Sequence, residues 1–172
     1  SMFQMTTGWT NNALPADIFS RRWLLNIGHV FFDLGLEKDP EFLIVYFLVL
    51  LLIVYAFYFT IRHAPLRIWL FIITLMAATT LPLLIPDIIK GGQRSIVPRY
   101  LFPGYLSIQL AVAYLLSQKI SQSRLLSRRI WQAIATLLIL AGIISCTLSS
   151  QANTWWIKEI SYSNPQVASF LN

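Results

Sequence analysis

The sequence predicts an all-α fold: a polytopic transmembrane helix bundle of four spans, preceded by an amphipathic helix at the membrane surface. Of the 172 residues, 56% are hydrophobic and 12% are charged, whereas soluble domains carry about 25% charged residues. Four apolar runs alternate with short charged or proline-containing breaks. Upstream of them, apolar residues recur at spacings of three and four. The net charge of +6 includes no long Lys/Arg block, so we expect lipid head groups and no nucleic acid as partners.

Residues 1–41 are expected to form an extracytoplasmic segment containing an interfacial helix. One helical face is apolar and holds Ile18, Phe19, Trp23, Leu24, Ile27, Val30 and Phe31. The other side is largely polar and holds Asp17, Ser20, Arg21, Asn26 and Asp33. This run is too short and polar to cross a bilayer, which favours a helix lying on the membrane surface. A helix packed on a soluble domain is the alternative.

Residues 42–148 are expected to form the four-helix transmembrane region. The predicted spans are 42–61, 66–85, 100–117 and 130–148. The first has twenty residues without a charge, enough at about 1.5 Å per residue to cross a core of roughly 30 Å. Residues 149–172 then form a polar extracytoplasmic tail, and we expect the chain to be part of a longer protein.

Local features of the spans predict how they pack. Two threonines and two prolines should kink the end of the second span: Thr79, Thr80, Pro82 and Pro86. Small residues that suit close helix packing occur in the third and fourth spans: Gly104, Ser107 and Ala111, then Gly142 and Cys146. For Gln109 we expect an interhelical hydrogen bond rather than a substrate contact. Trp155 and Trp156 suit an interfacial anchor.

The distribution of basic residues predicts the orientation. One side holds the 62–67 and 118–129 loops, with six Lys/Arg and no acid, and the other side holds seven Lys/Arg and all seven acids. Orientation follows the density of Lys/Arg in short loops. The acid-free side is therefore predicted to be cytoplasmic, with its 118–129 loop against anionic lipid. Residues 87–99 are then extracytoplasmic.

The loop between the second and third spans is the candidate binding site. An outward loop that carries Lys90, Arg94 and Arg99 against the single acid Asp87 departs from the usual bias. Arginine forks match phosphate oxygens, glycines at 91–92 allow close approach of a ligand, and the next helix adds its positive N-terminal end. We interpret the loop as a phosphate or pyrophosphate clamp. The alternative is arginines that reach ordinary lipid phosphates.

The loop and the helix that follows also resemble a known family. The string Gly91-Gly92-Gln93-Arg94-Ser95 and the element Arg99-Tyr100-Leu101-Phe102-Pro103 resemble integral-membrane glycosyltransferases of the dolichyl-phosphate-mannose protein mannosyltransferase type (GT-C fold, glycosyltransferase family 39-like). The fuller string, together with Pro98-Arg99-Tyr100, resembles bacterial, particularly cyanobacterial, members. Trp23, Asn26 and 31–33 upstream, and 155–156 and 164–165 downstream, fit the same group.

The resemblance implies an enzyme that transfers a sugar from a polyprenyl-phosphate carrier on the outer membrane face, in a bacterial inner membrane. It implies that Arg94 and Arg99 bind the carrier phosphate, with Tyr100 at interface depth and Lys90, Gln93 and Ser95 as weaker candidates. The family's catalytic acid lies in its N-terminal half, and we expect this chain to begin after that half. We therefore assign no catalytic residue, and Asp87 is expected to be solvated or paired rather than catalytic.

Three questions stay open at this level. His29 and Asp33, four residues apart, share a helix face, but two ligands do not make a metal site. We expect no cofactor and leave a divalent metal open. The alternatives in function are a transporter or flippase for a lipid-linked or anionic substrate, and a non-enzymatic membrane scaffold. Charges or broken helices near mid-membrane would favour a transporter, and the four span centres carry no charge.

Overall fold

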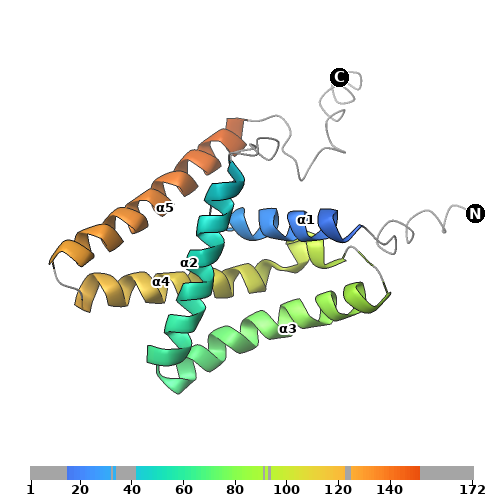
Figure 1. Ribbon diagram of the computed structural model, residues 1–172, viewed down its shortest axis with the longest axis horizontal. Coiled ribbons are helices and arrows are strands. Elements are labelled where there is room, and N and C mark those ends of the chain that lie inside the picture. Colours follow the sequence, from blue (N-terminus) through green and yellow to red (C-terminus); the bar gives the residue numbers. More distant parts are fainter. Residues whose placement is uncertain are drawn as a thin grey trace, which may run out of the picture.

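A computed structural model describes residues 15–31, 33, 42–90, 92, 94–122 and 125–151. These residues form five α-helices and two short 3-10 helices, in agreement with the predicted all-α class. The predicted features at 1–14, 34–41 and 152–172, which include Trp155 and Trp156, lie outside the described residues. Each of the four apolar runs forms a helix (Figure 1). The helices are α2 (Phe42–His63), α3 (Leu66–Lys90), α4 (Phe102–Gln122) and α5 (Leu125–Gln151).

The first helix, α1 (Ala16–Gly28), is shorter than the predicted run. Pro15 precedes it with its carbonyl accepting the Phe19 amide, and the chain turns after Gly28. The helix packs against α2 and against the connection between α3 and α4. Asn26, placed on the polar face by the sequence pattern, is buried, whereas Ile18 is exposed. The assignment of Asn26 to an outward polar face was wrong, because α1 buries a face that contacts α2 and also polar backbone of the α3–α4 connection.

Helix α4 occupies the centre of the arrangement. It contacts α2, α3 and α5, and in Figure 1 α3 and α5 lie on opposite sides of it. The predicted small-residue face is confirmed, because Gly104, Ser107 and Ala111 are all buried. Gly104 lies against Thr79 and Thr80 of α3. Small side chains let two helix backbones approach closely, and here they bring α3 onto α4.

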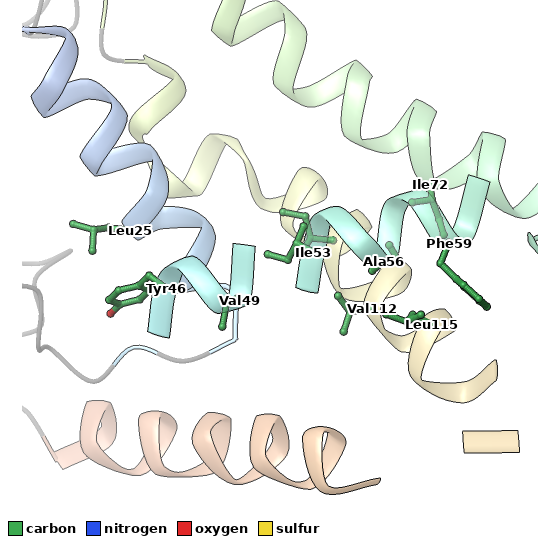
Figure 2. Close-up of a cluster of buried hydrophobic side chains, with 11 residues drawn as sticks. Leu25, Tyr46, Val49, Ile53, Ala56, Phe59, Ile72, Val112 and Leu115 are labelled. Carbon is green, nitrogen blue, oxygen red and sulfur yellow. The ribbon is translucent and has the colours of Figure 1, made fainter. Parts of the chain in front are cut away.

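The hydrophobic core lies where α2 crosses α4 (Figure 2). Its α2 members recur every three or four residues, as one face of a helix does: Tyr46, Val49, Ile53, Ala56 and Phe59. Helix α4 supplies Ile108, Ala111, Val112 and Leu115, while α1 and α3 add Leu25 and Ile72. Helix α5 contributes no member of this buried cluster in the described part of the chain, and it contacts α4 from outside.

Helix α3 continues through Pro82 and Pro86, and the kink expected there stays a prediction. The Thr79 hydroxyl donates to the carbonyls of residues 75 and 76, whereas the carbonyls that the prolines leave without an amide donor are those of 78 and 82. One detail of the predicted packing was wrong. In α5 the exposed Cys146 does not make the packing contact; the buried neighbour Ser145 does, through hydrogen bonds to the backbone of Asp33.

Three of the described helices are long and apolar enough to cross a membrane: Ile44–His63 of α2, Leu66–Ile89 of α3 and Leu125–Gln151 of α5. Few residues of the α3 and α5 segments are fully buried, 6% and 0% of their most apolar windows, and many of their large apolar side chains are exposed. Such surfaces are typical of helices that face lipid or other membrane helices. The chain is therefore a membrane-integral protein by length and composition. Helix α4 does not meet the same criterion, so the fourth span stays a prediction.

Long-range contacts between the helices gather at two opposite ends of the bundle. At one end, α1 and the turn after it meet the α3–α4 connection, α4 and the end of α5, through the pairs Trp23–Ser95, Val30–Gln109 and Asp33–Ser145. The predicted hydrogen bond of Gln109 thus exists, but its acceptor lies in the turn after α1. At the other end, Tyr114 donates to the His63 carbonyl and Tyr55 stacks on Trp131. The C-terminal parts of α2 and α4 and the N-terminal part of α5 therefore lie at one end, as the predicted alternation requires.

A glycine fixes how closely α1 approaches α2. A Cβ atom at Gly28 would overlap the ring of Tyr46, which is itself buried. We expect Gly28→Ala to lower the free energy of unfolding by about 2 kcal/mol, because α1 must move away from a packed ring. Dodecyl sulfate titration of the protein in mixed micelles measures this. Gly142→Ala is the matched control, since its Cβ would lie 3.5 Å from the Phe31 carbonyl oxygen, an ordinary contact. Equal stability of the two variants would contradict the prediction.

Candidate anion site at the α3–α4 connection

The connection between α3 and α4 is built from successive tight turns. Two 3-10 helices, η3 (Arg94–Ile96) and η4 (Pro98–Tyr100), lead directly into α4. Pro98 begins η4, where its missing amide is not needed. The amides of Val97, Tyr100 and Leu101 donate to carbonyls three residues earlier, at 3.0–3.3 Å. The predicted start of the third span at residue 100 was two residues early because these turns precede the helix.

Asp87 ties the connection to the end of α3. Its carboxylate oxygen Oδ2 accepts the backbone N–H of Ser95 at 2.6 Å, and the side chain is only 6% exposed. A carboxylate that accepts a backbone amide makes one of the stronger hydrogen bonds in proteins. Asp87 is therefore paired, one of the two states expected from the sequence, and it positions the loop.

Helix α1 holds the same loop from the other side. Trp23 donates its indole N–H to the Ser95 hydroxyl at 3.4 Å, and Asn26 donates its amide to the Ile96 carbonyl at 2.7 Å. Trp23 and Asn26 are three residues apart, so they lie on one face of the helix. Two elements far apart in sequence thus clamp residues 95 and 96.

The arginines of the connection lie on its surface. Arg94 and Arg99 are exposed, on η3 and η4 respectively. The Arg99 guanidinium donates to the Tyr100 hydroxyl at 3.1 Å and lies 4.9 Å from the centre of its ring. Tyr100 is 44% exposed. A neighbouring aromatic ring attracts the cation and limits its freedom, so Arg99 is partly preorganised for an anion outside the loop.

The predicted site residues thus fall into three groups. Arg94, Arg99 and Tyr100 are exposed on one short connection beside the N-terminus of α4. Ser95 is fully buried, so it could reach a ligand only if the loop moved, and its contact with Trp23 and Asp87 gives it a positioning role. Gln93 and the side chain of Lys90 lie outside the described residues.

Sequence reasoning missed the supports of this loop. Trp23 and Asn26 were assigned to opposite faces of an interfacial helix, and the buried bond between Asp87 and Ser95 was not foreseen. The available signals were an acid three residues from the end of an apolar helix and an amide among apolar residues. Neither signal identifies the hydrogen-bond partner, because the partner of Asp87 lies 8 residues away and that of Asn26 lies 70 residues away.

The pair His29 and Asp33 lies at the same end. Nε2 of His29 is 4.0 Å from Oδ1 of Asp33, and the His29 ring packs edge-on against Tyr46 at 5.7 Å. Among the described residues no group of three His, Cys, Asp or Glu side chains could hold a metal ion. The pair is thus part of the packing between α1 and α2.

Comparison with known proteins gives no relative: no protein-family model, curated protein or solved structure matches this chain. Two exposed arginines give a positively charged surface to a buried, hydrogen-bonded support just before α4. Such a surface suits a phosphate group.

Proposed function

We propose that this chain is the carrier-binding part of a membrane glycosyltransferase that transfers a sugar from a polyprenyl-phosphate donor. The observation that carries the proposal is the contrast within residues 94–99. Ser95 and Ile96 are buried and held by Asp87 and Asn26, while the two arginines stay exposed. A loop that orders its backbone and presents cations is preorganised for an anionic ligand.

The proposal includes a topology of four spans with α4 as the third, α1 at the outer interface and the 87–99 segment extracytoplasmic. The long-range contacts support this alternation, because the C-terminal parts of α2 and α4 contact each other and the N-terminal part of α5 contacts α2. Helix α4 needs less apolar surface than the other three, since α2, α3 and α5 cover it.

The proposed mechanism is electrostatic. As the bond between the anomeric carbon and the phosphate oxygen breaks, negative charge develops on the phosphate, and Arg94 and Arg99 stabilise it. The acceptor hydroxyl attacks the anomeric carbon and gives its proton to a general base. We assign that base to no residue of this chain and place it elsewhere in the protein, as the resemblance of 91–103 to the mannosyltransferase type implies.

The test is sugar transfer by membranes that contain the full-length protein, supplied with radiolabelled polyprenyl-phosphate-linked sugars. We expect label to leave the carrier and enter an acceptor, and a nucleotide-linked sugar to be inactive. Movement of intact donor across the bilayer without release of the sugar would instead support a flippase. If the donor is neither cleaved nor moved, the protein is a scaffold.

A further inference from the structure

A second charged surface lies at the end of the helices opposite the α3–α4 connection. Three helices meet there: α2 near its C-terminus, α4 near its C-terminus and α5 near its N-terminus. We call it the aromatic–lysine cluster, formed by Tyr55, Phe59, His63, Lys119 and Trp131. It plays no part in the proposed sugar transfer.

Stacked rings form the base of the cluster. Phe59 stacks on His63 at 4.2 Å between ring centres, and Tyr55 stacks on Trp131 at 6.2 Å. The ammonium of Lys119 lies 4.8 Å from the Phe59 ring centre and 5.8 Å from that of Tyr55. The attraction between a cation and a ring face keeps this flexible side chain in one place. The ammonium is therefore held at a defined point between two helices.

No carboxylate among the described residues shares this end with Lys119. The described acids all belong to the other end: Asp17 starts α1, Asp33 contacts Ser145, and Asp87 binds the loop. Two exposed arginines lie one helical turn from the rings. Arg62 follows Phe59 by three residues, and Arg128 precedes Trp131 by three.

We propose that the aromatic–lysine cluster binds the head-group phosphate of an anionic phospholipid. Lys119 supplies the central ammonium, with Arg62 and Arg128 at the rim. The choice of a lipid rests on position, since the apolar segment of α2 ends at His63, where head groups begin. The acyl chains would lie along the apolar residues exposed beside the cluster, Tyr58 and Ile61 on α2 and Ile130 on α5.

The experiment measures lipid binding to the full chain in detergent micelles by native mass spectrometry, with phosphatidylglycerol and phosphatidylcholine as probes. We expect tighter binding of phosphatidylglycerol. Lys119→Gln should weaken it about fivefold, corresponding to about 1 kcal/mol for one cation near an anionic surface, and leave phosphatidylcholine unchanged. Arg62→Gln, at an exposed position, should cause a similar loss, and Lys119→Arg should retain binding.

The matched control is Arg67→Gln, which removes an exposed charge from the start of α3, outside the cluster. We expect less than about a twofold change for this variant, because a charge beyond the site contributes only a screened field. Equal losses for Arg67→Gln and Lys119→Gln would show a diffuse electrostatic effect and overturn the site. So would equal binding of both lipids to the unsubstituted protein. These outcomes are independent of the outer loop, because Arg94 and Arg99 stay intact throughout.

Discussion

Sugar transfer by the full-length protein should fall about 100-fold when Arg99 is replaced by alanine, with a comparable loss for Arg94→Ala. Both guanidiniums lie on the exposed side of a loop whose backbone is fixed by Asp87 and Asn26. Their charges would therefore lie close to the departing phosphate and neutralise it. The measurement is the initial rate of label release from the polyprenyl-phosphate donor, at matched protein levels in the membrane.

Two further variants separate this role from general charge effects. Arg22→Ala removes an exposed arginine from α1, at the same end of the molecule, and should keep nearly full activity. Arg99→Lys keeps the charge but loses the fork that donates to Tyr100, so we expect an intermediate rate. Full activity of both alanine variants at 94 and 99 would show that these arginines are ordinary lipid anchors, even if the protein transfers sugar.

Asp87→Leu should cost on the order of 2–3 kcal/mol in the free energy of unfolding. The substitution leaves the buried amide of Ser95 without an acceptor. Losing a hydrogen bond to a charged group costs more stability than losing one between neutral groups. The peptide that contains residues 94–101 should also exchange its amide hydrogens faster. Dodecyl sulfate titration and hydrogen exchange measured by mass spectrometry provide the two readouts.

Asp87→Asn is the conservative partner of this variant. Its side-chain oxygen can still accept the Ser95 amide, so protection of the loop should largely persist. If Asp87→Asn exchanges as fast as Asp87→Leu, the hydrogen bond is not what orders the loop. If instead Asp87→Asn keeps the loop protected but abolishes transfer, the carboxylate has a chemical role that the pairing with Ser95 does not require.

The helices could be predicted well because their signal is local. Apolar runs located α2 to α5, and the errors concern their ends: α3, for example, continues past Pro86 and Asp87 to Lys90. The face of α4 that contains Gly104 was also predictable, since close packing requires small side chains. The buried face of α1 was not, because Asn26 satisfies its amide on a carbonyl that only the folded chain brings near.

The candidate site was predictable only in its exposed part. Arg94 and Arg99 could be predicted as site residues because they are charged and lie between two apolar runs. The support from Trp23 and Asp87 depends on distance in space, and a single sequence gives no measure of that distance. The aromatic–lysine cluster illustrates the same limit, since its rings come from α2 and α5 and its cation from α4.

The central place of α4 also constrains the order in which the protein can assemble during synthesis. Helices α2 and α3 leave the ribosome before α4, so the surface formed by Thr79 and Thr80 is already made when Gly104 emerges. Helix α5 follows and covers the remaining side of α4. Helix α4, the long helix that is not apolar enough to meet the criterion for a span, therefore has packing partners as soon as it forms. When α4 has left the ribosome it can pack on α2 and α3, and completion of α5 closes its last side.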